Sequence, residues 1–457
     1  MKQVMRVVAG MAVFAAAVGI SIGTEPDKPM DLTIWSDPAF QKEFLGSYGF
    51  QAEIEPRLSA VERQQLEKLI PLMGSDPNAA TVELEKLLTD QSSALFDYTL
   101  GNIAFQQGEL KQAALRYETA VKKFPSFRRA WKNLGLIYVR EGRYQEALKP
   151  LSRVIELGGG DGTVFGLLAY SYSATGQDTS AESAYRTALL LQPDTMDWKT
   201  GLAQSILRQR KYAEAATLAE ELIRKNPDRA EYWLMQANAW IGLKEPLKAA
   251  ENFEIVHRMG KAGAGVLQTL GDIYTNESMW QLAGRAYVAS LEKDPSQSIE
   301  RPLRNVEVMA QRGAIADSRT LLDTIKRQYA GQVDDDGRRR ILKLEARIAL
   351  AGGDSGAAVA ALEEAVAIDP LDGEALMLLG QHYGKHDDPE KAIFFYERAE
   401  SLEAYEADAR VRHAQILVNQ ARPAEAVPLL KRAQEIKPRE EIARYLEQVE
   451  RAARSKN

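Results

Sequence analysis

The chain has 457 residues, of which 45% are hydrophobic and 27% are charged, so it contains enough apolar side chains to fold. Its 58 Lys and Arg residues oppose 64 Asp and Glu residues, a formal net charge of −6, which argues against a general binder of nucleic acid. It contains no Cys and only four His. This composition excludes disulfides, thiolate metal sites and Cys nucleophiles within the chain.

Residues 1–23 have the pattern of a secretory signal. Lys2 and Arg6 precede an apolar run that begins at Val7, and a polar break follows at Thr24, as in a signal peptide. The run is about 17 residues long, near the lower limit for a membrane span, so an uncleaved amino-terminal anchor is the alternative. Both readings predict that the rest of the chain is periplasmic, either free or anchored to the inner membrane, with no other membrane contact.

From residue 94 the sequence repeats with a period of 34 residues. In each block the eighth and twentieth residues are small, and the eleventh and twenty-fourth are mostly large. Small residues at these positions let two antiparallel helices approach closely, and the large residues fill the adjacent space. Glycines near the fifteenth position and late prolines end the helices, so each block is predicted to be a helical hairpin. The blocks begin at residues 94, 128, 162, 196, 230, 264, 339, 373 and 407, with a degenerate block near 299.

The period of 34, the segment Trp131 to Tyr138 and the following Ala147 resemble tetratricopeptide repeats. The resemblance covers residues 94–440. It implies an all-α fold, a right-handed superhelical solenoid of about ten helical hairpins with capping helices. It also implies a concave face, lined by the first helix of each hairpin, that holds peptides or protein segments.

The composition and the repeat register together divide the chain into seven segments. In chain order they are a signal peptide or anchor (1–23), an aromatic-rich arm (24–58), a divergent helical pair (59–93), a first repeat array (94–332), an acidic insertion (333–338), a second repeat array (339–440) and a capping helix (441–457).

Residues 31–57 lie outside the repeat pattern and contain five aromatic residues, from Trp35 to Phe50. One interpretation is a docking arm that covers the apolar end of the first repeats. The other is a partner-binding element, because aromatic side chains are effective anchors for association. The stretch from Trp35 to Pro56 also resembles the amino-terminal region of tetratricopeptide proteins assigned to TonB energy-transduction systems, which would imply an accessory to an inner-membrane motor.

In tetratricopeptide repeats the second, fifth, sixth, ninth, twelfth and thirteenth residues of each block face the concave side. The resemblance therefore implies a protein-binding groove whose side chains are amides, cations and aromatic rings, suited to an extended peptide backbone. Lys132, Asn133 and Asn102 are similar to part of the carboxylate clamp of some relatives. The predicted groove residues are Tyr98, Asn102, Phe105, Lys132, Asn133, Leu136, Arg140, Tyr170, Gln204, Arg208 and Asn238.

No combination of residues predicts catalysis, a cofactor or a metal. His382 and His386 are four residues apart, which would place both imidazoles on one helix face, but no third ligand is identifiable. We therefore expect a non-enzymatic scaffold for protein–protein interactions in the bacterial cell envelope, with TonB-system components as candidate partners. The alternative is a periplasmic chaperone or assembly factor for cell-wall or outer-membrane biogenesis.

Overall fold

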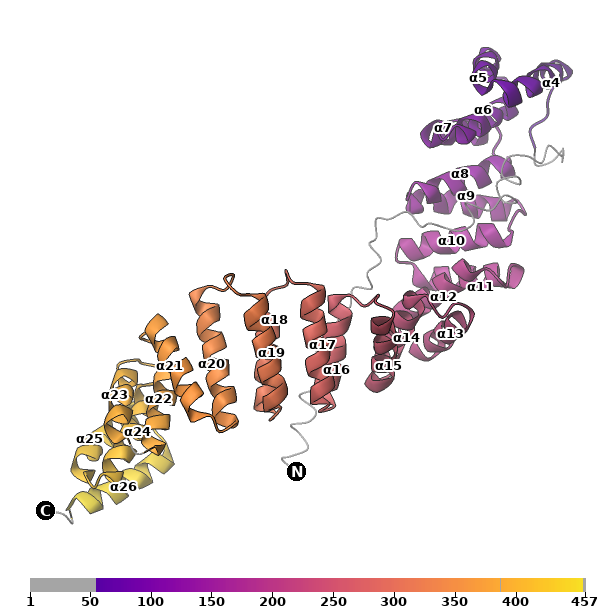
Figure 1. The fold of residues 1–457 in the computed structure, drawn as a ribbon. Helices are drawn as coiled ribbons and strands as arrows, with labels where there is room; N and C mark the ends of the chain where they lie inside the picture. Colours follow the sequence, from indigo (N-terminus) through magenta and orange to yellow (C-terminus); the bar gives the residue numbers. More distant parts are fainter. Residues whose placement is uncertain (1–54, 387, 455–457) are drawn as a thin grey trace. The chain divides into compact units, whose positions relative to one another are not determined.

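The computed structural model describes residues 55–386 and 388–454, and all regular structure within them is α-helical (Figure 1). The predicted signal or anchor and most of the aromatic-rich arm, residues 1–54, lie outside the described residues. None of the described helices combines the length and the apolar character needed to cross a bilayer. The chain divides into two compact units, Met1–Asn252 and Phe253–Asn457, with the boundary inside helix α15 (Pro246–Arg258).

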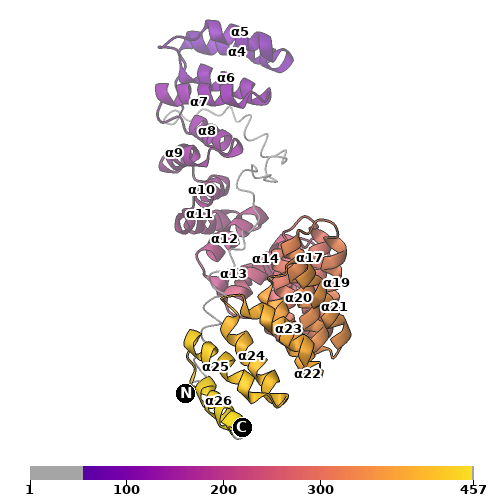
Figure 2. The ribbon, with the colours of Figure 1, turned by 90° about the vertical axis from the view of Figure 1, so that its left-hand side faces the viewer.

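In the first unit each helix packs against the next, and the first helices of successive hairpins also touch: α8 contacts α10, α10 contacts α12, and α12 contacts α14 (Figures 1 and 2). These first helices therefore form one layer. The helices of this unit are α4 (Ala60–Ser75), α5 (Pro77–Lys86), α6 (Ala94–Gln106), α7 (Leu110–Lys123), α8 (Arg128–Arg140), α9 (Tyr144–Glu156), α10 (Gly162–Ala174), α11 (Asp178–Leu191), α12 (Met196–Arg208), α13 (Tyr212–Lys225) and α14 (Ala230–Gly242).

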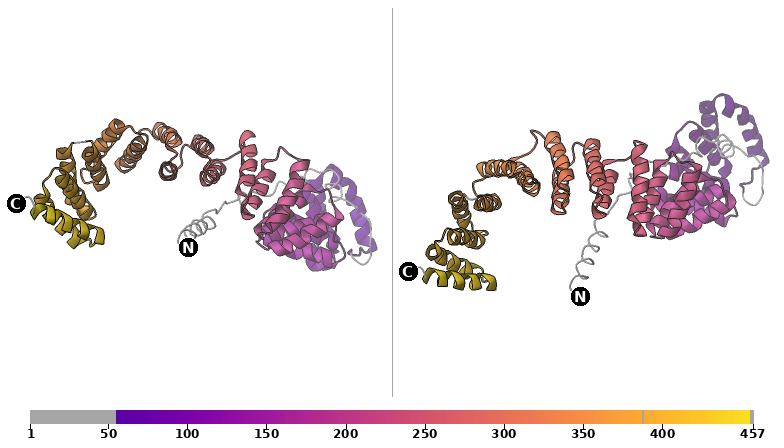
Figure 3. Two further views of the ribbon diagram at one scale, coloured as in Figure 1. Left: turned by 90° about the horizontal axis from the view of Figure 1, so that it is seen from below. Right: turned by 60° about the horizontal axis from the view of Figure 1, so that its bottom comes forward.

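The second unit repeats the same arrangement, in which each helix packs against the next along the chain (Figures 1 and 3). Its helices are α16 (Ala264–Asn276), α17 (Trp280–Lys293), α18 (Glu300–Gln311), α19 (Ile315–Gln328), α20 (Asp335–Ala351), α21 (Ser355–Ile368), α22 (Gly373–Lys385), α23 (Pro389–Glu400), α24 (Glu406–Asn419), α25 (Pro423–Ile436) and α26 (Glu440–Arg454). This succession of hairpins confirms the predicted all-α solenoid of tetratricopeptide type.

The alanine column at the twentieth position lies where each hairpin is tightest. Every alanine of this column has no exposed surface, which confirms the predicted close approach of the two helices. In the degenerate block Ser318 takes this place, and its buried hydroxyl donates to the carbonyl of Ala314 at 2.7 Å. The buried alanines are Ala113, Ala147, Ala181, Ala215, Ala249, Ala283, Ala358, Ala392 and Ala426.

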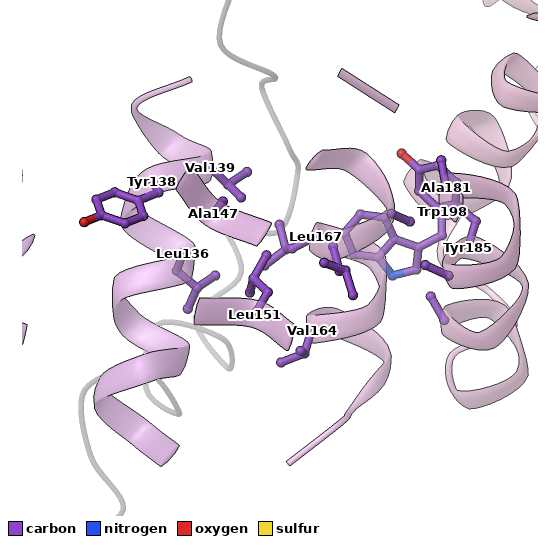
Figure 4. Packing of buried hydrophobic residues seen from close by; sticks show 14 of the residues in the cluster. Leu136, Tyr138, Val139, Ala147, Leu151, Val164, Leu167, Ala181, Tyr185 and Trp198 are labelled. Carbon is purple, nitrogen blue, oxygen red and sulfur yellow. The ribbon is translucent and has the colours of Figure 1, made fainter. Parts of the chain in front are cut away.

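One continuous apolar core runs through the first unit from α6 to α14. Figure 4 shows part of it, where Leu151 of one hairpin lies between Leu136 and Leu167. Trp198 and Tyr185 extend the same core into the following hairpin, and both are completely or almost completely buried. Because each layer of this core is shared by adjacent repeats, a single hairpin has no complete core of its own.

The turn between the two helices of a hairpin places its fifteenth residue in the left-handed region. Four of these residues are the predicted glycines, Gly108, Gly142, Gly176 and Gly353, with φ between 74° and 82°. Where the sequence has no glycine, the backbone keeps the same conformation at a cost. The residues concerned are Arg210, Lys244, Ser278 and Ala421, with φ between 58° and 63°.

The segments that flank the repeats are also helical. Residues 59–93 contain α4 and α5, and Ser59 and Glu62 form a capping box at the start of α4. The acidic stretch 333–338 begins α20: Asp334 is its N-cap, and Asp334 Oδ1 accepts a hydrogen bond from the Gly337 amide at 2.8 Å. Acidic residues in a first turn also interact favourably with the helix dipole. At the other end, α26 buries Ile442 and Val449 against α24 and α25.

Candidate protein-binding surface

All eleven predicted groove residues lie on the first helices of the first unit. Helices α6 and α8 carry seven of them, from Tyr98 to Arg140, and α10, α12 and α14 carry Tyr170, Gln204, Arg208 and Asn238. Because α8, α10, α12 and α14 contact one another in order, their side chains share one continuous layer. We call this layer the first-helix surface.

Three of the predicted groove residues form a buried polar cluster with Tyr117 of α7. The Asn133 side-chain amide nitrogen lies 3.3 Å from Asn102 Oδ1 and from the hydroxyls of Tyr98 and Tyr117. The Tyr117 hydroxyl also donates to Asn102 Oδ1 at 2.7 Å. Burial raises the pKa of both phenols, so both hydroxyls stay protonated at neutral pH. The cluster ties α6, α7 and α8 together.

This burial changes the role of the clamp-like residues. Asn102 is 9% exposed and Asn133 4% exposed, so a ligand reaches these amides only if the cluster opens. Lys132 is also engaged, because its ammonium lies 2.8 Å from Asp161 Oδ2. Leu136, 1% exposed, belongs to the apolar core. The three clamp-like side chains therefore do not converge on one open position.

The other predicted residues are half-buried or exposed, and most have named partners. Gln204 Nε2 donates to Glu231 Oε1 at 3.1 Å, and Arg208 Nε donates to Asp178 Oδ1 at 2.8 Å. Arg140 is exposed and its guanidinium lies over the Phe105 ring, 5.7 Å from the centroid. Tyr170 packs edge-on against Tyr144 at 5.2 Å between centroids, and Asn238 is half-buried.

The polar partners on the first-helix surface come from neighbouring hairpins. Lys132 of α8 pairs with Asp161, the N-cap of α10, and Gln204 of α12 bonds to Glu231 of α14. Arg208 likewise pairs with Asp178, at the start of α11 in the preceding hairpin. The sequence interpretation missed Asp161, Asp178 and Glu231. The available signal was spacing, since each partner stands 27 to 30 residues from its mate, slightly less than one repeat.

Of the two histidines that stand four residues apart, His382 lies on α22 and His386 is the C-cap of that helix. The His382 and His386 rings lie 4.3 Å apart between centroids, and Ser355 Oγ lies 3.4 Å from His386 Nε2. Burial, together with the neighbouring His386 ring, lowers the pKa of His382. In residues 55–386 and 388–454 no group of three or more His, Asp or Glu side chains is arranged to hold a metal ion.

Comparison with known proteins identifies the repeat type. The tetratricopeptide repeat family matches residues 98–162, 167–221, 200–256 and 343–409, which confirms the predicted repeats over these ranges. No curated protein matches the chain.

Several solved structures are similar at low sequence identity. One is YrrB, described as a TPR protein with an unusual peptide-binding site, with 17% identity over 39% of this chain and 92% of that chain, at a TM-score of 0.36. A second is Naa15/Naa10 bound to HypK-THB, with 15% identity over 85% of this chain and 65% of that chain, at a TM-score of 0.41. A third is pilF of Pseudomonas aeruginosa, with 21% identity over 45% of this chain and 92% of that chain, at a TM-score of 0.34.

Proposed function

Because residues 98–256 and 343–409 contain tetratricopeptide repeats, we propose that the chain is a non-catalytic scaffold that binds an extended protein segment along its first-helix surface. Proteins of this repeat type bind proteins or peptides. The proposal rests on the observation that polar side chains of this surface pair with acidic side chains that a ligand could replace. Lys132, Gln204 and Arg208 are each held by an acidic side chain of a neighbouring hairpin.

Such pairs are easily exchanged for contacts with a ligand. Ion pairs that remain open to solvent contribute only about 0–1 kcal/mol, so a carboxylate or carbonyl of a bound segment can replace one partner at little cost. The released Asp161, Asp178 and Glu231 can then accept hydrogen bonds from the backbone amides of that segment. An extended peptide offers both kinds of group at each residue.

The layer beneath this surface is already ordered. The Asn102, Asn133 and Tyr117 cluster fixes α6 and α8, and the apolar core continues through α14. A surface that needs little reordering loses less conformational entropy when a ligand binds. This rigidity supports a binding role for the surface.

The proposed location is the bacterial cell envelope, as an accessory component of a TonB energy-transduction system. The support is the sequence of residues 1–23, with Lys2 and Arg6 before an apolar run, and the resemblance of the stretch from Trp35 to Pro56 to proteins of such systems. A reporter fused after residue 100 tests export. Activity of a periplasmic reporter is expected, and activity of a cytoplasmic reporter alone would refute export.

Affinity purification from membranes, followed by mass spectrometry, tests the binding role. The Lys132→Ala/Arg208→Ala variant removes both cations, and we expect partner recovery to fall by up to about tenfold, since two solvent-open pairs together contribute at most about 1–2 kcal/mol. The matched control is Lys149→Ala/Arg153→Ala on α9, which removes two cations from a second helix. Loss of capture by the control alone would refute the surface assignment. Recovery of cell-wall synthases or outer-membrane assembly proteins in place of TonB-system subunits would favour the chaperone or assembly role.

A further inference from the structure

The residues that precede α4 lie against the start of α8. Glu55 is only 9% exposed, and Glu55 Oε1 lies 2.7 Å from Arg129 Nε in the first turn of that helix. The Arg129 guanidinium in turn lies over the Tyr98 ring of α6, 5.3 Å from its centroid. Pro56 is also buried. A segment two hairpins earlier in the solenoid therefore contacts the first-helix layer at α8.

The path from α4 back to Glu55 has a defined direction. Glu62, in the first turn of α4, accepts a hydrogen bond from the amide of Ser93, the N-cap of α6, at 2.8 Å. Residues 55–59 then lead from the start of α4 to the start of α8. Five extended residues span about 16 Å, which is close to two helix spacings of about 8–10 Å. Followed backwards from α4, the described part of the chain therefore ends at Glu55, beside the beginning of α8.

The residues before Glu55 are opposite in net charge to the starts of α8, α10 and α12. Residues 31–54 contain four acidic residues (Asp31, Asp37, Glu43 and Glu53) and one basic residue (Lys42), a net charge of −3. At the starts of α8, α10 and α12, four basic side chains outnumber two acidic ones: Arg128, Arg129, Lys132 and Lys199 against Asp161 and Asp197. Opposite charges on two surfaces favour their association. The arm also contains five aromatic residues that gain from burial.

We propose that residues 31–54 bind in cis along the first turns of α8, α10 and α12, so that the chain's own arm covers the first-helix surface. Twenty-four extended residues reach up to about 80 Å, more than three helix spacings require. A tethered segment acts at an effective concentration of order millimolar, so it competes strongly with a separate ligand. The competitive role rests on the proposed function, whereas the binding of the arm does not.

Paired cysteines provide a direct test, because the chain has no native Cys. The full chain with Ser47→Cys and Lys132→Cys is compared with a control that carries Ser47→Cys and Lys149→Cys. Lys149 is exposed on α9, the second helix of the same hairpin. Ser47 is eight residues from Glu55, a reach of about 26 Å, so a freely moving arm reaches both positions.

The readout is the initial rate of cross-linking by a short bis-maleimide, normalised to the rate at which each thiol reacts with a simple maleimide. We expect the Lys132→Cys pair to react at least about tenfold faster than the control, since a docked arm favours one side of the hairpin. Equal rates would overturn the proposal. Cross-linked dimers from mixed single-Cys chains, at a rate above the intramolecular one, would also overturn it and assign the surface to a second copy.

A charge exchange tests the anchor. Arg129→Glu should lower the Lys132→Cys cross-linking rate, and Glu55→Arg combined with Arg129→Glu should restore it. A thermal melt of each variant verifies that the helices remain folded. No partner takes part in these measurements, so their result is independent of the proposed function. Deletion of residues 31–54 then addresses the competitive role: tighter partner capture supports it, and unchanged capture despite a positive cross-link contradicts it.

Discussion

The most specific stability test concerns Gly271, at the eighth position of its repeat. An added Cβ at Gly271 would lie 2.9 Å from Tyr287 Cζ and closer still to two other ring carbons. The ring has little freedom to move away, because Tyr287 is 3% exposed and its hydroxyl bonds to Asp272 at 2.9 Å and to Thr275 at 3.0 Å. Gly271→Ala should therefore destabilise the hairpin of α16 and α17.

The expected change in the free energy of unfolding for Gly271→Ala combines opposing effects. Replacing Gly by Ala inside a helix stabilises it by about 1 kcal/mol, while overpacking a filled core typically costs about 1–3 kcal/mol. Displacing the Tyr287 hydroxyl from its buried acceptors adds about 1 kcal/mol or more. The net expectation is a loss of about 2 kcal/mol.

Helix α16 contains its own control. Gly265 is exposed, and a Cβ added there would have no neighbouring atom within 4 Å, so Gly265→Ala should be neutral or stabilising by up to about 1 kcal/mol. Urea unfolding followed by circular dichroism, with hydrogen exchange to localise the change, measures both. Equal stability of the two variants would refute the packing argument. Adding Tyr287→Leu to Gly271→Ala should recover part of the loss, since Ala346 with Leu362 and Ala414 with Leu430 are native pairs at these positions.

Three further outcomes follow from the structure. Lys244 and Gly176 both have positive φ, a backbone conformation that only Gly adopts without strain. Lys244→Gly should therefore stabilise the chain by about 0.5–1 kcal/mol, and Gly176→Ala should destabilise it by a similar amount. Equal melting temperatures for the two variants would contradict this. Ala181→Leu should cost about 1–3 kcal/mol in the unfolding free energy, since Ala181 is completely buried between two helices, and unchanged melting would contradict the assigned register. Burial would raise the pKa of Glu182, but hydrogen bonds from Lys211, Arg186 and Gln209 lower this pKa to about 2. The contribution of ionised Glu182 to stability is therefore complete above the ordinary carboxyl pKa of 4.5 and is lost as the pH falls toward 2. The difference in melting temperature between the native chain and Glu182→Gln should shrink over this range, and a constant difference would argue against these hydrogen bonds.

The hairpins were predictable because their determinants recur in the sequence at a fixed spacing. Ala181 and its counterparts mark the closest helix contact in every repeat, and the glycines near the fifteenth position mark the turn. The sequence indicates less clearly which neighbouring repeat a side chain packs against. The other repeats with a tyrosine at the twenty-fourth position have Gly at the eighth (Gly101, Gly271 and Gly380), whereas the hairpin of the buried Tyr185 has Ala169 there. The structure resolves this by packing the Tyr185 ring against Gly201 of the next repeat, where an added Cβ would lie 2.8 Å from Tyr185 Cε1.

The proposed binding surface was less predictable, because position in the repeat does not determine whether a polar side chain faces solvent. Asn102 occupies the ninth position, which is assigned to the groove, but it turns inward to accept a hydrogen bond from Tyr117, fifteen residues later. Asp272 and Tyr287 repeat the same contact at the same spacing. A hydrogen-bond partner stabilises a buried tyrosine hydroxyl, and in these two hairpins the ninth residue supplies one.

This pairing inside the hairpin reduces the number of polar side chains that a ligand could contact. In the hairpins of Tyr117 and Tyr287, the polar ninth residue is already used inside the hairpin and contributes rigidity rather than contacts. The side chains left for the proposed binding role are those whose partners belong to other repeats, such as Lys132 with Asp161 and Arg208 with Asp178. The number of side chains available to a ligand therefore depends on how neighbouring hairpins pack against each other. A substitution that shifts one hairpin relative to the next should alter binding even when the substituted residue does not contact the ligand. The Gly271→Ala variant offers the comparison, because its strain lies in the second unit, whereas the predicted binding residues all lie in the first. If each repeat interacts mainly with its neighbours, that variant should lose stability and still capture the partner.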